Sequence, residues 1–349
     1  MDRQALTATT RIVALVGVVV FAAACGTSPS EQPTKRGAAP APEPSLPAGV
    51  PAGGTVVELE SRLEKEFEIP GEPDWMAEGF DSVWVSRTDP EGEGNFLDRI
   101  DPSTNEVAAS IPVGQNPCHG VAVGFDAVWV PSCIDQRIDR VDPAKNEVVR
   151  SFDVPLHRAD GDRIVAAFEA LWIVSPDPKG GDALGRIDPG TGKLDTIPLP
   201  TLSTEVVEGF GSLWVMSPEG GTVHRVDPKG MSVTGSIEGL GEPETAAAGE
   251  SILWVKDAAD GTVAGVDPDS LAITERIAAG GPGKGGGIAA DASGVWFRPA
   301  NYLLGRIDPA VGKVTEVFAD TPALGDVLVA FDSVWFSGYT KDTVWRITA

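Results

Sequence analysis

Polar and charged side chains stand at a fixed distance from a series of regularly spaced tryptophans. Ten residues before the first five of the series come Asp74, His119, Asp162, Thr204 and Glu244. Close to such positions lie Trp75, Arg163, Glu205 and Asp326, and two or three residues after tryptophans come Arg87, Lys256, Asp257 and Arg298. Carboxylates beside an aromatic ring can hold a polar or cationic group through charge-assisted hydrogen bonds and cation–π contact.

The same residue types permit other interpretations, which the sequence leaves open. Polar side chains can simply solvate a rim, and carboxylates can bind a divalent cation, although no ligand loop of fixed spacing is present. His119 and His157 lack a third ligand at zinc spacing, and no nucleophile elbow, phosphate loop or metalloprotease motif occurs. We therefore expect a binding site without cofactor, metal or catalytic residues. Its expected members are Asp74, Trp75, Arg87, His119, Asp162, Glu205, Glu244 and Arg298.

These positions belong to a sequence repeat. The tryptophans that mark it lie 39 to 45 residues apart: Trp84, Trp129, Trp172, Trp214, Trp254, Trp296 and Trp335. Between them an Asp-Pro pair recurs after a β-branched residue, as in Ile187-Asp188-Pro189. Each copy contains four short strand-like segments, and almost no segment has helical periodicity. Seven such copies predict an all-β fold, a seven-bladed β-propeller with four antiparallel strands per blade.

The repeated residues themselves are expected to be structural. One tryptophan per blade at a fixed register predicts packing between neighbouring blades, and Asp followed by Pro suits a type I turn. Trp75 stands outside this register, so it is the aromatic residue that we expect to face a ligand.

The two ends of the chain are expected to meet in one blade. The last copy ends at residue 349, after its third strand. Upstream of the first copy, Leu63-Glu64-Lys65-Glu66-Phe67-Glu68-Ile69 repeats the apolar spacing of the first blade's outer strand at residues 107–113. We expect this N-terminal strand to complete the last blade, which also covers an edge that would otherwise favour aggregation.

The first residues have the features of an export signal. Arg3 and Arg11 precede an apolar stretch at residues 12–24, which is too short to cross a hydrocarbon core of about 30 Å. Phe21-Ala22-Ala23-Ala24-Cys25-Gly26 resembles a bacterial lipobox. We expect a signal peptide at residues 1–24, a lipid on Cys25, a Pro- and Ala-rich tether at residues 25–55 and the propeller at residues 56–349. The protein would be extracytoplasmic and anchored to the bacterial cell membrane.

Lipidation of Cys25 leaves one pair of cysteines, Cys118 and Cys133. They flank the turn at residues 125–126 symmetrically, and we expect a disulfide, which persists in an oxidising compartment. The net charge of −24 disfavours phosphate backbones, so we expect no nucleic-acid partner. We also expect a monomer.

Two repeated motifs carry a family resemblance. They are Trp84-Val85-Ser86-Arg87 and Arg186-Ile187-Asp188-Pro189-Gly190-Thr191-Gly192-Lys193-Leu194. Over roughly residues 56–349 the chain resembles the bacterial extracytoplasmic propellers of the YVTN type. The wider group includes streptogramin B lyase, which opens a cyclic depsipeptide with His and Glu residues and Mg²⁺, including a Glu-x-His element. None of the three histidines here, His119, His157 and His224, follows a glutamate by two residues.

Two functions therefore remain open. We expect a cell-surface lipoprotein whose non-catalytic propeller binds a small polar or cationic ligand, a peptide or a protein partner at its acidic face. The alternative is a lyase or hydrolase of the streptogramin B lyase type, acting at the same face. The two differ in whether a general base can be placed against a substrate.

Overall fold

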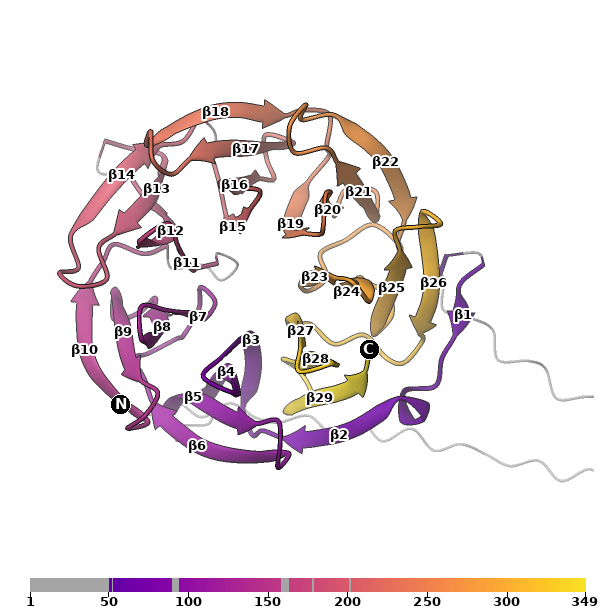
Figure 1. Ribbon diagram of the computed structural model, residues 1–349, viewed down its shortest axis with the longest axis horizontal. Coiled ribbons are helices and arrows are strands. Elements are labelled where there is room, and N and C mark those ends of the chain that lie inside the picture. The colour runs from indigo at the N-terminus through magenta and orange to yellow at the C-terminus, as the bar shows by residue number, and fades with distance from the viewer. Residues whose placement is uncertain (1–49, 52, 90–93, 158–162, 178, 201) are drawn as a thin grey trace, which may run out of the picture. The chain divides into compact units, whose positions relative to one another are not determined.

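The four strands of every repeat are present in a computed structural model of the protein. It describes residues 50–51, 53–89, 94–157, 163–177, 179–200 and 202–349. The strands form seven sheets arranged around one axis, each with four antiparallel strands, which confirms the predicted seven-bladed β-propeller (Figure 1). In each blade the first strand lies next to the axis and the last at the circumference.

Consecutive blades use consecutive strands. Blade one consists of β3 (Glu72–Gly79), β4 (Ser82–Asp89), β5 (Gly94–Asp101) and β6 (Glu106–Pro112). Blade two consists of β7 (Ala122–Gly124), β8 (Ala127–Ser132), β9 (Arg137–Asp142) and β10 (Glu147–Asp153). Blade three consists of β11 (Val165–Ala167), β12 (Ala170–Pro176), β13 (Asp182–Ile187) and β14 (Leu194–Pro198). Blade four consists of β15 (Glu205–Gly209), β16 (Ser212–Ser217), β17 (Thr222–Asp227) and β18 (Ser232–Ile237).

The last three blades continue this order, and two of them also take strands from the N-terminal region. Blade five consists of β19 (Pro243–Ala248), β20 (Leu253–Asp257), β21 (Thr262–Val266) and β22 (Ile273–Ala278). Blade six consists of β23 (Ile288–Asp291), β24 (Gly294–Phe297), β25 (Leu304–Asp308) and β26 (Lys313–Phe318), with β1 (Thr55–Val56) beside it. Blade seven consists of β27 (Val327–Ala330), β28 (Ser333–Gly338), β29 (Thr343–Thr348) and β2 (Leu63–Glu68). A short 3₁₀ helix (Leu59–Ser61) separates β1 from β2.

The ring closes through the N-terminal strand, as predicted. β2 pairs antiparallel with β29, with Leu63 opposite Ile347 and Phe67 opposite Val344. The ring of Phe67 stacks on Trp335 at 5.7 Å. One pairing was not predicted: β1 adds a short parallel strand to β26, although the sequence placed Thr55 in the tether. Two neighbouring blades are thus held by chain from both ends.

The repeated tryptophans pack between blades. All seven rings are buried. The indole N–H of Trp84 donates to the carbonyl of Gly79 at 3.0 Å, and four other blades repeat this bond. Arg99 lies over the Trp84 ring at 5.3 Å and donates to the carbonyl of Pro143 in the next blade at 2.8 Å. The fixed tryptophan position of the repeat is therefore used for contacts between blades, as expected.

The Asp-Pro positions form turns. In blade three the carboxylate of Asp188 accepts the backbone N–H groups of Gly190 at 3.0 Å and Thr191 at 2.7 Å. Hydrogen bonds from Thr191 lower the pKa of Asp188 below its usual range. Asp142 and Asp267 accept equivalent backbone bonds in blades two and five. These carboxylates stabilise turns, as the sequence predicted.

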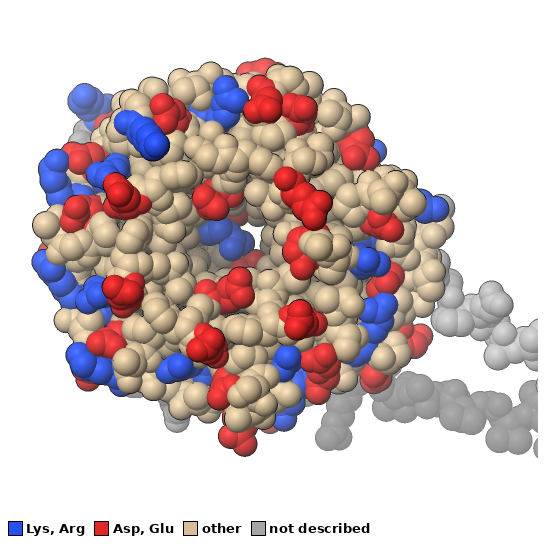
Figure 2. All heavy atoms as spheres, viewed as in Figure 1, with Lys and Arg blue, Asp and Glu red and all other residues tan. Residues whose placement is uncertain are grey.

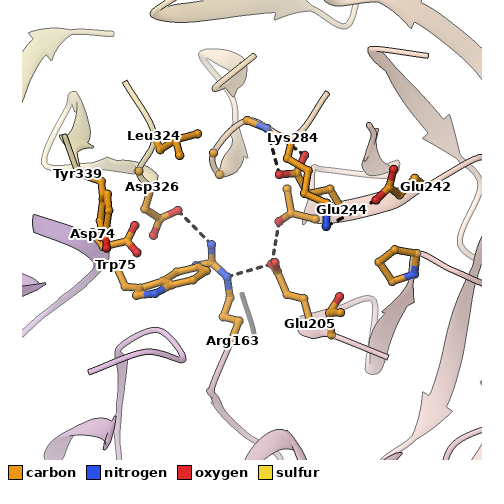
Figure 3. Close-up of a pocket in the computed structure, with 17 residues that line it drawn as sticks. Asp74, Trp75, Arg163, Glu205, Glu242, Glu244, Lys284, Leu324, Asp326 and Tyr339 are labelled. Carbon is orange, nitrogen blue, oxygen red and sulfur yellow. Dashed lines mark hydrogen bonds and ion pairs between the residues drawn. The ribbon is translucent and has the colours of Figure 1, made fainter. Parts of the chain in front are cut away.

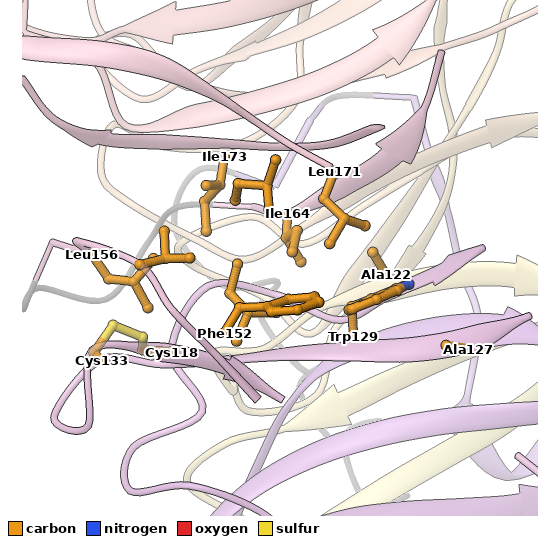
Figure 4. Close-up of a cluster of buried hydrophobic side chains, with 13 residues drawn as sticks. Cys118, Ala122, Ala127, Trp129, Cys133, Phe152, Leu156, Ile164, Leu171 and Ile173 are labelled. Carbon is orange, nitrogen blue, oxygen red and sulfur yellow. A yellow bond between two sulfur atoms is a disulfide. The ribbon is translucent and has the colours of Figure 1, made fainter. Parts of the chain in front are cut away.

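The predicted disulfide joins Cys118 to Cys133 (Figure 4). Their Cα atoms lie 5.9 Å apart. Both cysteines belong to a buried cluster between blades two and three, in which Trp129 stacks on Phe152 with ring centroids 6.0 Å apart. The bond thus ties the loop before β7 to the end of β8.

The innermost strands define two faces. Because every blade begins with its innermost strand, the N-terminal ends of these strands gather at one face and their C-terminal ends at the other. In a view along the ring axis, acidic side chains are spaced around the central hollow, and basic atoms are visible inside it (Figure 2).

The expected signal peptide, the lipidation site Cys25 and most of the tether lie outside the described residues. Within the described part of the chain, no helix has the length and apolar character needed to span a membrane.

Candidate functional site

A cavity of about 370 Å³ opens where the N-terminal ends of the innermost strands meet. This volume suits a small organic ligand. Most of the wall comes from the first residues of innermost strands and the loops before them, and Pro218 and Tyr339 come from loops after second strands. The wall consists of Asp74, Trp75, Arg163, Thr204, Glu205, Pro218, Glu242, Glu244, Thr245, Lys284, Gly285, Gly286, Gly287, Leu324, Gly325, Asp326 and Tyr339.

Arg163 connects three blades in this cavity (Figure 3). From blade three its Nε donates to Glu205 Oε1 of blade four at 3.1 Å, and its Nη2 donates to Asp326 Oδ1 at the start of blade seven at 3.0 Å. Both carboxylates are buried. Since two carboxylates share one guanidinium, the three side chains together carry an excess of negative charge when both acids are ionised.

Glu205 is the most strongly perturbed acid of the wall. Burial raises the pKa of Glu205 to about 7, against the opposing effects of Arg163 and of the hydrogen bond from Thr245. Thr245 Oγ1 donates to the same oxygen, Oε1, at 2.7 Å. Near neutral pH this carboxyl therefore exchanges between its charged and neutral forms.

Trp75 supplies an aromatic wall. The guanidinium of Arg163 lies over its ring at 5.2 Å, within the range of a cation–π contact. The indole nitrogen is buried, and no described residue accepts a hydrogen bond from it. Trp75 thus lies outside the inter-blade register, as the sequence indicated, but its ring already has a cationic neighbour from the chain.

Two acid–base pairs border the cavity on the side of blade five. Glu244 Oε2 lies 3.0 Å from Lys256 Nζ, and Glu244 also accepts the backbone N–H of Gly285 at 3.1 Å. Burial lowers the pKa of Lys256. Glu242 and Lys284 lie 3.5 Å apart in a more exposed pair. The outer pair is therefore the one that a ligand from solvent meets first.

A glycine-rich loop before β23 shapes this border. A Cβ on Gly285 would lie 2.2 Å from the carbonyl oxygen of Arg298, and one on Gly286 would lie 1.8 Å from that of Gly325. Such contacts are impossible for a side chain, so the loop can approach blades six and seven only with glycine. This approach places Lys284 at the mouth of the cavity.

Half of the expected site residues lie on the cavity wall: Asp74, Trp75, Glu205 and Glu244. Asp162 lies outside the described residues. The remaining three, Arg87, His119 and Arg298, are not among the residues that line the cavity.

Arg298 corrects the expectation that its side chain faces the mouth. It is completely buried, and it donates to the backbone carbonyls of Leu303 at 2.7 Å, Ser337 at 2.6 Å and Asp326 at 3.2 Å, and to that of Ala323. It therefore joins blades six and seven.

Arg87 and His119 are also turned away from the cavity. Arg87 pairs with Asp98 at 2.6 Å and stacks on Phe96 at 4.3 Å within blade one. His119 is buried beside the disulfide, with Nε2 2.9 Å from the carbonyl of His157. Burial lowers the pKa of His119 to about 4, so this imidazole is neutral at physiological pH.

The side chains of the described residues include possible metal ligands. Their one group of three potential ligands close enough for a shared ion is Cys118, His119 and Cys133. Because both cysteines are joined in the disulfide, their sulfurs are not thiolate ligands. The cavity carboxylates do not form such a group.

Sequence reasoning missed several wall residues, namely Glu242, Thr245, Lys284, Leu324 and Tyr339. It placed Arg163 and Asp326 near the mouth but did not select them. The available sequence signal for Arg163 and Asp326 was their position at or just before the start of innermost strands, because Glu205 was selected by the same position. Lys284 had a further signal, its place inside the glycine-rich run of residues 280–287.

Comparison with known proteins supports the fold and indicates no particular function. No protein-family model and no curated protein matches the chain. Among solved structures it is similar to the β-propeller domain of Cps50 (Swd1) from Myceliophteria thermophila, with a TM-score of 0.65, 10% identity, and coverage of 82% of this chain and 99% of that chain. It is also similar to hydrazine synthase from Kuenenia stuttgartiensis, with a TM-score of 0.63, 14% identity, and coverage of 82% and 97%.

A third similar structure is BamB from Moraxella catarrhalis, with a TM-score of 0.58, 12% identity, and coverage of 80% of this chain and 83% of that chain. At these identities the likeness extends to the propeller architecture and not to a function. The class that fold and cavity define is a seven-bladed propeller with an acidic cavity at one face.

Proposed function

We propose that this chain is a non-catalytic binding propeller that holds a small ligand with ammonium or guanidinium groups in the cavity around Arg163. The observation that carries the proposal is the charge of the wall. Five carboxylates line it, and the cationic groups beside them are Arg163, Lys284 and Lys256. Negative charge is therefore in excess, and Trp75 and Tyr339 line the same cavity.

The geometry favours a ligand that enters from the side of Glu242. Its carboxylate is more exposed than that of Glu244, and its lysine partner is an exposed side chain at 3.5 Å. An ammonium group can replace Lys284 there without leaving a buried charge unpaired. Charge-assisted hydrogen bonds of this kind contribute about 1.5–3 kcal/mol each.

We further propose that the protein belongs to the YVTN-type extracytoplasmic propellers and is anchored to a bacterial membrane through Cys25. The motifs at residues 84–87 and 186–194 and the lipobox-like segment before Cys25 support this. Mass spectrometry of the membrane fraction should find a diacylglyceryl group on Cys25, and Cys25→Ser should release the protein. A soluble wild-type protein with unmodified Cys25 would end this part of the proposal.

Catalysis is favoured by one observation, the pKa of Glu205 near 7, because such a carboxyl suits a general base. However, Glu205 Oε1 already accepts hydrogen bonds from Arg163 and Thr245. We therefore expect no opening of a cyclic depsipeptide with added Mg²⁺. Turnover that Glu205→Gln abolishes would replace the binding proposal with an enzyme.

Calorimetric titration with spermidine tests the binding proposal, with citrate as a ligand of opposite charge. Asp74→Asn with Glu242→Gln should weaken spermidine about ten- to a hundredfold, because two charged acceptors are lost. The matched control, Glu106→Gln with Glu147→Gln, removes the same charge from exposed outer strands and should leave affinity unchanged. Equal losses of affinity in both variants would mean that only the net charge of the protein matters, and this would reject the proposed site.

A further inference from the structure

The turn between the first and second strand of a blade carries a phenylalanine in five of the seven blades. These residues are Phe80, Phe125, Phe168, Phe210 and Phe331. The corresponding turns of blades five and six contain Glu250 and Ala292 instead. Those two turns have a different backbone conformation, because neither Glu250 nor Ala292 has a positive φ, whereas all five phenylalanines do. The strands can therefore be joined without an aromatic residue, but through a different turn.

The backbone disfavours phenylalanine at these five places. All five have positive φ, between 51° and 55°. A side chain with a Cβ is strained in this left-handed region, where hairpin turns prefer asparagine and glycine. Phe80 is 38% exposed and Phe125 and Phe210 are each 37% exposed. Phe168 and Phe331 are half-buried and pack against hydrophobic clusters. Packing thus accounts for Phe168 and Phe331, and it accounts least for the exposed Phe80, Phe125 and Phe210.

The five turns share one face. They follow the C-terminal ends of the innermost strands, whereas the cavity lies at the N-terminal ends. A glycine precedes Phe80, Phe125 and Phe210 and lets neighbouring blades approach closely. A Cβ on Gly79 would lie 2.3 Å from Val123, and one on Gly209 would lie 2.5 Å from Ala248. Five of the seven blades thus carry a phenylalanine at the face opposite the cavity, which we call the aromatic-turn face.

Exposed carboxylates accompany the rings. Asp81, Asp126, Glu169 and Asp332 follow four of the phenylalanines directly, and all four are exposed. The nearest arginines of this face keep their positive charge but are held by neutral groups of the chain, as Arg99 is by the ring of Trp84 and the carbonyl of Pro143. In the groove of about 310 Å³ beside Phe125, Arg140 lies over Trp129 at 5.7 Å and Arg150 donates to the carbonyl of Gly190 at 2.6 Å.

We propose that the aromatic-turn face docks a basic protein segment in which lysine or arginine alternates with apolar residues. A cation over a phenylalanine ring gains a cation–π contact and reaches the carboxylate that follows the ring, while the apolar side chains cover the exposed rings. The four exposed carboxylates that follow the rings are complementary in charge to such a segment. This surface is separate from the cavity and does not depend on the function proposed for it.

The test uses the whole protein and a fluorescent ten-residue peptide of alternating lysine and leucine, followed by anisotropy. Phe80→Asn, Phe125→Asn and Phe210→Asn combined should weaken binding about tenfold or more. The same variant should melt at an equal or higher temperature, because asparagine tolerates the turn. The control Ile134→Asn with Leu202→Asn removes exposed apolar side chains from loops of the cavity face and should bind like the wild type.

A second variant tests the charges without touching the rings. Asp81→Asn, Asp126→Asn and Asp332→Asn should weaken the peptide and reduce the dependence of its affinity on salt. Asp74→Asn with Glu242→Gln should leave peptide binding unchanged, which separates this proposal from the cavity. Absence of peptide binding, equal binding of a glutamate–leucine peptide, or wild-type affinity of the phenylalanine variant would each overturn the proposal.

Discussion

Replacing Glu205 by glutamine should remove a large part of the pH dependence of stability. Folding raises the pKa of this carboxyl from 4.5 to about 7 through burial. Because the folded value is the higher one, folding favours the neutral form. The associated stability is complete below pH 4.5 and is lost as the pH rises through 7, and a shift of this size corresponds to about 3 kcal/mol.

Glutamine preserves the contacts that Glu205 makes. Arg163 and Thr245 both donate to Oε1, so an amide oxygen in that place accepts both hydrogen bonds, and Asp326 remains to balance Arg163. The variant should therefore be more stable than the wild type at pH 8 by about 2–3 kcal/mol and nearly equal to it at pH 4.5.

Urea unfolding followed by tryptophan fluorescence at pH 4.5, 6, 7 and 8 measures this difference. Because burial lowers the pKa of His119, both proteins lose stability in acid. This loss is the same in both proteins, so it cancels when their free energies of unfolding are compared at each pH. Parallel pH profiles for wild type and Glu205→Gln would refute the reasoning, because Glu205 would then ionise at its ordinary pKa.

Three further predictions concern the ring itself. Deleting residues 56–70 removes β2 from β29 and should cause aggregation or a Tm lower by at least about 10 °C; an unchanged melt would mean that closure does not need this strand. Cys133→Ser should lose up to about 3 kcal/mol in urea unfolding, and the reduced wild type should lose the same amount; a variant as stable as the oxidised wild type would contradict this. Arg298→Met should lose at least about 3 kcal/mol because buried carbonyls lose their donor, while exposed Lys193→Met should change stability by less than about 0.5 kcal/mol.

The architecture was predictable because it is periodic. A tryptophan in every copy and an Asp-Pro turn after it fix the blade, and the apolar spacing of Leu63 and Phe67 identified the strand that closes the ring. The parallel pairing of β1 was not predictable, because two exposed residues beside an outer strand carry no apolar pattern of their own.

The site was predictable only in part because the repeat gives the face of a residue and not the direction of its side chain. Glu205 begins an innermost strand and Arg298 follows a second strand, so both positions lie at the face of the cavity. The side chain of Glu205 lines the cavity, whereas that of Arg298 donates to buried backbone carbonyls. Contacts such as that between Arg163 and Asp326 join blades that are far apart in sequence. Their geometry depends on the closed ring, which no single repeat encodes.

The location of bound spermidine in a crystal is the most direct test of the proposed binding site. Crystals of the protein soaked with spermidine should show the polyamine in the cavity, with an ammonium nitrogen within hydrogen-bonding distance, about 2.7–3.2 Å, of Glu242 or Asp74 and near the ring of Trp75. Spermidine bound elsewhere, or a cavity left empty at concentrations that saturate the protein in solution, would contradict the account.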